Sequence, residues 1–328
     1  MANNDGVSAP HGRGAFIGRA MPRFEDLRLV RGAGNYTDDV SVPGETYAAF
    51  VRAPHAHARV VSIDVSAARG RPGVLAVLTG EDYVGDGHIG MAHFPNPADA
   101  NDVSIPTFAP TPERKILDQL QLPLAVGCVR FVGEAVAVVV AESAGAARDA
   151  AEAVAVEYQV LPAVTDVMDA LADGAPTIWP DAPNNLALDC AFGDRAAVEA
   201  AIKGAHVVIE QTIRNQRTAS AFLEPRAAIG SYDAAQKQHT LISGCQGAHR
   251  LRHALAACFK VQQERVHVIC PDVGGAFGSR FNIYPEQVAV VWAARRVGRP
   301  VKWTGDRSEA FLTDYTARDV VTRARYSP

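Results

Sequence analysis

The sequence predicts an α+β protein built from two consecutive regions. Its 328 residues and its 48% hydrophobic content suffice for two buried cores, and 21% charged residues is typical of a globular chain. Between about residues 40 and 165, short β-rich runs alternate with helical patterns, and the same mixture resumes after residue 190. The loop-rich stretch 173–185 lies between them and is the candidate linker.

The first region opens with an arm and continues with strands. Residues 1–24 are rich in Gly, Ala, Asn and Pro without periodicity, which predicts a loose N-terminal arm. Runs bounded by turn residues are predicted strands, and they lie at 46–53, 59–65, 74–80 and 129–143. A Pro- and Asn-rich stretch at 85–112 predicts a long surface loop. A helical pattern at 148–156 and a strand at 157–164 complete the region.

The second region mixes helices and strands in the same way. A helix is predicted from Asp194, its N-cap, to a C-terminal glycine at Gly204. Strands are predicted at 206–215, 239–246 and 266–270. Residues 248–259 predict a second helix, since their apolar residues share one face: Ala248, Leu251, Leu255, Cys258 and Phe259.

Composition excludes several classes of protein. The formal net charge of −4 and the lack of a long basic run argue against a nucleic-acid partner. The longest apolar runs, such as Ala135–Ala141, are too short to cross a bilayer. The N-terminus has neither an apolar signal core nor a twin-arginine pair, so we expect a cytoplasmic location without membrane insertion. Five cysteines without C-x-x-C spacing resemble neither a disulfide framework nor a zinc or iron–sulfur site, so any cluster would belong to another chain.

The most unusual stretch is VICPDVGGAFGSRF, Val268–Phe281, in which two glycines, a phenylalanine and a third glycine follow an apolar strand. A dinucleotide fingerprint starting at Gly274 would need glycine at Ala276 and Ser279, and neither a phosphate-loop Lys-Ser/Thr pair nor a Gly-x-Ser-x-Gly elbow is present. Two interpretations remain. Spacing alone favours a strand-to-helix turn with Phe277 in the core; the alternative is a loop whose glycines let a ligand approach free backbone N–H groups.

Other polar residues have both structural and functional interpretations. Gln246 stands at a strand end before a predicted helix, where its amide either caps the helix or points at a ligand near the positive N-terminus. His249 and His253 lie four residues apart on that helix and could share a metal ion, but neighbouring arginines favour a solvated basic face. His55 and His57 lack a nearby carboxylate to complete a ligand set and are expected to be structural.

In order along nearly the whole chain, these segments resemble the large subunit of the molybdenum hydroxylases, the family of xanthine dehydrogenase, aldehyde oxidase and carbon monoxide dehydrogenase. The matching segments are Gly18–Val40, Ala48–Ala68, Gly73–Asp82, VRFVGEAVAVVVAES (Val129–Ser143), LEPRAAI (Leu223–Ile229), GCQGAHRLRHAL (Gly244–Leu255), CPDVGGAFGSR (Cys270–Arg280) and Val297–Asp319. Their common order makes the resemblance far more specific than any one motif.

The resemblance implies an α/β hammerhead domain at 25–160, followed at 161–328 by the first part of a mixed α/β molybdopterin-binding domain. It also implies a molybdenum–molybdopterin cofactor, in the cytosine dinucleotide form usual in bacteria, whose metal is held through the pterin and not by protein side chains. Gln246 falls on the family's glutamine beside the metal. The implied cofactor-binding residues are Gln246, Gly247, Gly274, Gly275, Ala276, Phe277 and Gly278. The glycine loop would donate backbone hydrogen bonds, and Phe277 would wall the site.

The implied activity is oxidoreductase chemistry on a small molecule. Such an enzyme hydroxylates an aldehyde or N-heteroaromatic substrate with water and passes electrons through 2Fe–2S clusters on a small subunit to FAD on a medium subunit. Phe281 stands where purine-oxidising members have a glutamate, which argues against xanthine. Carbon monoxide is a weaker expectation, because the cysteine loop of carbon monoxide enzymes lies beyond this sequence.

The sequence stops at Pro328, less than halfway through a usual large subunit. The family's base glutamate is therefore expected beyond this chain, and no catalytic residue is assigned within it. One hypothesis is that the chain is the N-terminal portion of such a subunit, either a natural split-gene product or a truncated one, and is inactive without the missing second half or its partner chains. The alternative is a truncated, non-catalytic fragment that acts as a binding or assembly module; a neighbouring reading frame that encodes the second half would favour the split subunit.

Overall fold

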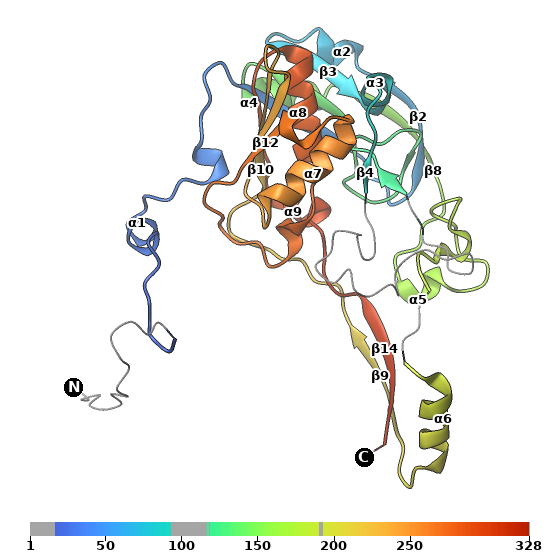
Figure 1. The fold of residues 1–328 in the computed structure, drawn as a ribbon. Coiled ribbons are helices and arrows are strands. Elements are labelled where there is room, and N and C mark those ends of the chain that lie inside the picture. Colours follow the sequence, from blue (N-terminus) through green and yellow to red (C-terminus); the bar gives the residue numbers. More distant parts are fainter. Residues whose placement is uncertain (1–16, 93–116, 118, 190–192, 328) are drawn as a thin grey trace. The chain divides into compact units, whose positions relative to one another are not determined.

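The computed structural model describes residues 17–92, 117, 119–189 and 193–327, and the chain divides into two compact units, 1–35 and 36–328. In the first unit, helix α1 (Asp26–Val30) follows an Arg23–Asp26 ion pair of 2.7 Å. All elements discussed below belong to the second unit (Figure 1). The predicted arm and the predicted loop at 85–112 lie largely outside the described residues.

A seven-stranded mixed sheet forms the centre of the second unit, with strand order β12-β11-β10-β13-β1-β7-β3 (Figure 1). The strands are β1 (Thr46–Arg52), β3 (Val74–Thr79), β7 (Ala135–Ala141), β10 (Ala227–Asp233), β11 (Gln238–Ile242), β12 (Val266–Ile269) and β13 (Val301–Thr304). β1 and β13 pair in parallel, and the Thr46 amide donates to the Pro300 carbonyl at 2.8 Å. Strands from both predicted regions thus share one sheet, and a domain boundary at residue 160 stays a prediction.

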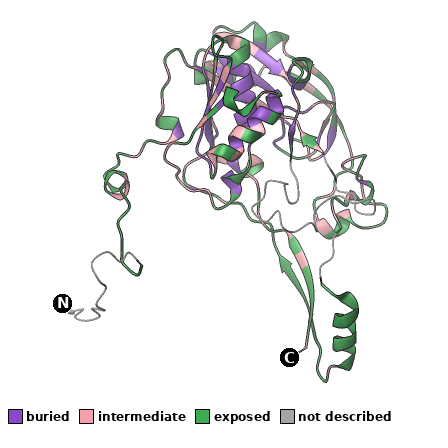
Figure 2. Cartoon of the chain, viewed as in Figure 1, coloured by how far each residue is buried: buried purple, intermediate pink, exposed green. Residues whose placement is uncertain are grey.

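Helices cover both faces of this sheet at β7. Val138 and Val140 pack in one core cluster with Val288 of α8 (Pro285–Val297), whereas Val139 packs in another with Ala150 of α4 (Ala144–Ala151). Every residue of β7 is buried, and Figure 2 shows that buried segments gather at the centre of the second unit. A strand buried on both faces needs a continuous apolar sequence and not an alternating one, which explains the run AVAVVVA.

Smaller sheets and further helices complete the second unit. The strands are β2 (Ala58–Asp64), β6 (Cys128–Val129) and β8 (Ala155–Val160) in a three-stranded sheet, and β4 (Met91–Ala92) paired with β5 (Leu120–Gln121). β9 (Ile209–Asn215) and β14 (Val320–Tyr326) form an antiparallel ribbon that is mostly exposed (Figure 2). The remaining helices are α2 (Ser66–Arg69), α3 (Gly80–Gly85), α5 (Val167–Ala170), α6 (Arg195–Gly204), α7 (Ala248–Phe259) and α9 (Arg307–Thr313). In the described part of the chain, no helix has the length and apolarity needed to span a membrane.

Several predicted elements are confirmed, and others differ in their bounds. Helix α7 has the predicted bounds, and Asp194 caps α6 by accepting from the Ala197 amide at 2.9 Å. The helix predicted at 148–156 instead occupies 144–151, where Ser143 caps its first turn. The shift arises because residues from Ala155 onward pair with β2 as strand β8. Tertiary pairing therefore places the last residues of the predicted helix in a strand.

Candidate functional site

The glycine loop and the Gln246 turn meet at one edge of the main sheet. β11 and β12 are parallel neighbours, so their carboxyl ends, which lead into these two segments, lie at the same edge. The Gln246 amide donates to the Arg280 carbonyl at 3.0 Å, and the Gly244 amide donates to the Thr37 hydroxyl at 2.9 Å. Gln246 itself is exposed and precedes Gly247, the residue before α7. The structure therefore brings the predicted site segments together.

The loop needs its glycines for two different reasons. Gly275 and Gly278 have φ angles of +110° and +92°, in the left-handed region that side chains disfavour. At Gly274 a Cβ would lie 2.4 Å from the Glu224 Cβ, and at Gly275 it would lie 2.8 Å from the Phe222 Cβ. The loop is thus packed so closely on the segment before β10 that even alanine would displace it.

The loop offers unpaired backbone donors. Its main-chain amide groups at residues 275–278 donate no hydrogen bond to any described residue, whereas the Gly274 amide is held by Glu224. Successive free N–H groups in a left-handed turn form a concave site for an anion or for ligand acceptor atoms. The Phe277 ring is 77% exposed, so the interpretation that placed it in the core is wrong. The hydrogen-bonding chemistry of the loop fits the acceptor-rich pterin and phosphate groups of a molybdopterin cofactor.

Sequence reasoning missed the ion pair that holds the loop in place. Glu224 Oε2 accepts from the Gly274 amide at 2.7 Å and from Arg280 Nη1 at 2.6 Å, and the Arg280 guanidinium also donates to the Glu224 carbonyl. The Arg280 side chain is 2% exposed and stacks over the Phe222 ring at 4.2 Å. Glu224 and Arg280 are 56 residues apart, so spacing gave no sign of their contact. The only signal was that both residues lie in segments of the family resemblance.

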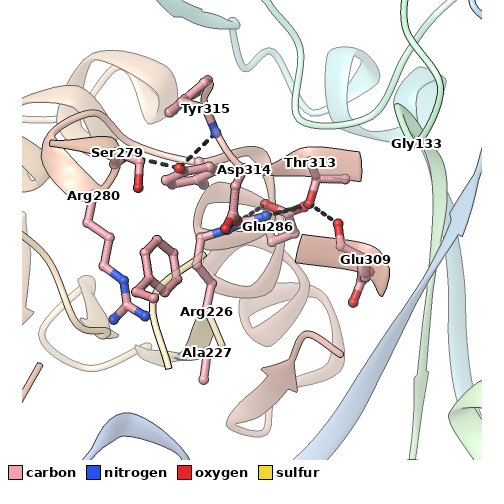
Figure 3. A network of polar contacts seen from close by, with 12 residues as sticks. Gly133, Arg226, Ala227, Ser279, Arg280, Glu286, Glu309, Thr313, Asp314 and Tyr315 are labelled. Atoms are coloured by element: carbon pink, nitrogen blue, oxygen red, sulfur yellow. Dashed lines mark hydrogen bonds and ion pairs between the residues drawn. The ribbon is translucent and has the colours of Figure 1, made fainter. Parts of the chain in front are cut away.

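A second buried charge network centres on Arg226 and Glu286 (Figure 3). The Glu286 carboxylate accepts from Arg226 Nη1 at 2.6 Å and from Arg52 Nη2 at 2.8 Å, and Arg226 Nε also donates to Asp314 at 2.6 Å. Burial raises the pKa of Glu286, but the two guanidinium groups outweigh burial and hold that pKa at about 2. Arg52 lies on β1 and Arg226 just before β10, so the network ties both predicted regions together.

Tyr284 links this network to the glycine loop. The Arg226 guanidinium lies over the Tyr284 ring at 3.8 Å, and the Tyr284 hydroxyl donates to the Ser279 carbonyl at 2.9 Å. The same hydroxyl accepts from the Tyr315 amide at 3.1 Å. Burial raises the pKa of Tyr284 to about 12, so the hydroxyl stays protonated at neutral pH.

A cavity of about 920 Å³ lies next to the network, and it is lined by aromatic and charged side chains, including Glu134, Trp179, Arg250 and Phe281. The Arg250 guanidinium lies over the Phe281 ring at 4.0 Å, so this aromatic ring is oriented by a cation. Burial raises the pKa of Glu134 to about 7, although its carboxylate accepts from the Arg130 amide at 2.5 Å. The cavity wall therefore carries a carboxyl group that can hold or release a proton near neutral pH.

Three of the four histidines singled out in the sequence, His55, His57 and His253, have structural partners, and His249 is exposed. The His57 ring contacts the Pro162 carbonyl at 2.7 Å through Nδ1, and the His55 ring packs edge-on against Tyr158. His253 Nδ1 lies 3.1 Å from Gln263 Nε2. Among the residues that the structure describes, no group of three His, Cys, Asp or Glu side chains could hold a metal ion.

Two family models match the chain in succession. Residues 31–162 match the aldehyde oxidase and xanthine dehydrogenase a/b hammerhead domain, and residues 178–327 match the molybdopterin cofactor-binding domain. Among similar proteins, the carbon monoxide dehydrogenase large chain of Hydrogenophaga pseudoflava is 34% identical over 90% of this chain. The nicotine 6-hydroxylase large subunit of Paenarthrobacter nicotinovorans is 32% identical over 95% of it. In each case the match spans only 36% of the relative's length.

Solved structures agree with these matches. Quinoline 2-oxidoreductase from Pseudomonas putida 86 superposes with a TM-score of 0.80 at 32% identity, over 94% of this chain and 37% of that one. Reconstituted CO dehydrogenase from Oligotropha carboxidovorans superposes with a TM-score of 0.82 at 32% identity and the same coverage. The fold is thus that of a hammerhead domain followed by a molybdopterin cofactor-binding domain.

Proposed function

This chain belongs to the molybdenum hydroxylase family, and from that premise we propose that it supplies part of the molybdopterin site in the large subunit of an oxidoreductase. The observation that carries the proposal is the contact of the Gln246 turn with a glycine loop whose amides at 275–278 donate to no residue that the structure describes. When bound, the molybdenum cofactor supplies the centre that accepts two electrons from the substrate. We propose its cytosine dinucleotide form.

The residues of the chain would bind and orient that cofactor. The loop amides at residues 275–278 donate hydrogen bonds to its acceptor atoms, and the Gln246 side chain supplies both an amide donor and a carbonyl acceptor. Gly247 leaves the N-terminus of α7 without a side-chain cap, so the positive end of the helix remains open to an anionic group. The exposed Phe277 ring supplies an apolar wall that keeps water from one side of the site.

For the substrate we propose an aldehyde or an N-heteroaromatic compound, and we favour the second class. The cavity beside the loop is lined by Phe131, Trp179 and Phe281, which suit a flat aromatic ring. Phe281 cannot form the charged hydrogen bond that the glutamate of purine-oxidising relatives would provide. Two similar proteins bear names that refer to N-heteroaromatic compounds, nicotine and quinoline. Glu134 would provide a carboxyl group that exchanges protons near neutral pH.

Electrons would leave through other chains. We propose a 2Fe–2S small subunit and an FAD-containing medium subunit as partners, and a second molybdopterin-domain chain if the large subunit is split. Relatives named as large chains or subunits of such enzymes support this composition. A cytoplasmic location is part of the same proposal.

The test is to isolate the chain from its native host and to measure its molybdenum content and its co-purifying proteins. We expect stoichiometric molybdenum together with iron–sulfur and flavin chains. Gln246→Glu replaces an amide donor by a negative charge and should lower the molybdenum content severalfold, whereas Gln211→Glu, on the exposed strand β9, should leave it unchanged. A metal-free wild-type chain without these partners would contradict the proposal and favour a non-catalytic binding module.

A further inference from the structure

Two cysteines without an assigned role lie side by side at the sheet edge that carries the glycine loop. Cys245 follows β11 and Cys270 follows β12, and these strands pair in parallel. The Cys245 amide donates to Cys270 Sγ at 3.4 Å, and Cys270 Sγ lies 3.5 Å from the Cys245 carbonyl oxygen. The two thiol groups also share a hydrogen bond with each other. Their sulfur atoms are therefore neighbours, which is what a direct bond between them requires.

The two thiols differ in exposure and in acidity. Cys270 is exposed, whereas Cys245 is buried. A hydrogen bond from the Cys245 thiol stabilises the Cys270 thiolate and lowers the pKa of Cys270 to about 6, and the same contact raises the pKa of Cys245. Two charged groups face Cys270: Arg280 favours the thiolate and Glu224 disfavours it. One member of the pair is thus an accessible nucleophile at neutral pH, and its neighbour is shielded.

We propose that Cys270 and Cys245 form a thiol–disulfide exchange site that reacts with low-molecular-weight disulfides such as glutathione disulfide. The Cys270 thiolate attacks one sulfur of the small disulfide, so a mixed disulfide forms and one thiolate leaves and takes a proton from water. Cys245 then loses its proton to solvent and attacks the Cys270 sulfur, which expels the second thiolate. The balance is two protein thiols oxidised to one disulfide and one small disulfide reduced to two thiols.

The cross-link would join the two segments of the candidate site. Cys245 directly precedes Gln246, and Cys270 lies four residues before Gly274. A bond between them would fix the ends of β11 and β12 to each other beyond the point where their backbone pairing stops at Ile242 and Ile269. Oxidation would thereby restrict the motion of the Gln246 turn against the glycine loop. The exchange chemistry itself needs no cofactor and does not rest on the proposed function.

The experiment treats the reduced chain, residues 1–328, with glutathione disulfide in the absence of air, followed by intact mass measurement and peptide mapping. Every protein carries Cys190→Ser, because Cys190 lies outside the described residues. We expect the mass of the protein to fall by two hydrogen atoms and one mapped cross-link, between Cys245 and Cys270. Cys245→Ser should instead stop at a glutathione adduct on Cys270, because no thiol remains to resolve it. Cys128→Ser is the matched control and should cross-link like the parent protein.

The reaction rate provides a second readout in the same samples. At pH 7 a thiol of pKa about 6 has roughly thirtyfold more thiolate than an ordinary cysteine. Each such thiolate is about tenfold less nucleophilic, because nucleophilicity falls with the pKa. Cys270 should therefore react about two- to threefold faster than an ordinary thiol. Burial raises the pKa of Cys128, which should therefore react more slowly than Cys270. Below about pH 6 the rate at Cys270 should fall.

Two results would overturn the proposal: a Cys190→Ser parent chain that forms no Cys245–Cys270 cross-link, or adducts that form equally fast on Cys128 and Cys270. The first result is obtained with Cys245 and Cys270 both unchanged, so misfolding caused by a substitution at either of them cannot obscure it. Molybdenum content in protein from the native host is measured separately. The proposed thiol site can therefore be refuted without refuting the proposed cofactor site, and the proposed cofactor site can be refuted without refuting the thiol site.

Discussion

Replacing Glu286 by glutamine tests whether the buried charge network holds the two predicted regions together. Glu286 is 1% exposed and lies between Arg52 and Arg226, and glutamine has the same shape without the charge. The variant leaves two buried guanidinium groups facing a neutral amide, one of whose ends is a donor that repels their N–H groups. We therefore expect a large loss of stability at neutral pH.

The size of the loss follows from the pKa of the carboxylate. Its value falls from 4.5 to about 2 on folding, and at about 1.4 kcal/mol per unit this corresponds to ~3 kcal/mol. Loss of one partner of a buried ion pair costs about 3–5 kcal/mol, which agrees. Because the folded-state pKa is lowered, the contribution is fully present above pH 4.5 and is lost as pH falls through 2. At pH 3 roughly 2 kcal/mol of it should already be gone.

The assay is urea unfolding of wild type and Glu286→Gln at pH 7 and pH 3. The difference in unfolding free energy should be ~3 kcal/mol at pH 7 and clearly smaller at pH 3. Glu142→Gln is the control, since its side chain is 62% exposed and lies 3.7 Å from Arg299; it should cost less than about 0.5 kcal/mol. A Glu286→Gln difference below 1 kcal/mol, or one that is the same at both pH values, would refute the reasoning.

Two further predictions concern the loop and the cavity. Gly274→Ala should destabilise the chain by about 1–3 kcal/mol, because the new Cβ would overlap Glu224. Gly145→Ala is the control and should stabilise the chain by up to about 1 kcal/mol, because Gly145 lies in a helix with open space around it. Thermal unfolding of both variants measures the two effects, and equal shifts of the midpoint would contradict the prediction. For Glu134 the folded-state pKa is raised from 4.5 to about 7, so the folded state keeps a proton that the unfolded state loses, and stability should fall as pH rises through that window. Glu134→Gln should remove this decline in stability, which amounts to up to ~3 kcal/mol between pH 4.5 and 7. The measurement is the urea midpoint as a function of pH. If the variant keeps the pH profile of the wild type, another group causes the decline.

The sequence by itself determined the local elements and the family. The apolar run of β7, the turn residues around β3 and the one-sided apolar pattern of α7 are local signals, because the strand and helix repeats are set by neighbouring residues. The ordered segments of the resemblance also identified the hammerhead and molybdopterin cofactor-binding domains. Two local signals misled: spacing favoured a buried Phe277, which is exposed, and the pattern at 148–156 predicted a helix where the observed helix ends at Ala151.

Only the tertiary structure decided how the site is held. Three contacts at the site join residues far apart in the sequence. Glu224 contacts Gly274, 50 positions away; Thr37 contacts Gly244, 207 positions away; and Cys245 contacts Cys270, 25 positions away. No periodicity encodes such pairs, because they form only when the parallel strands β11 and β12 end at the same sheet edge. The same holds for Phe277, which is 77% exposed, because burial depends on what the rest of the chain places around a residue and not on the spacing of its neighbours in the sequence.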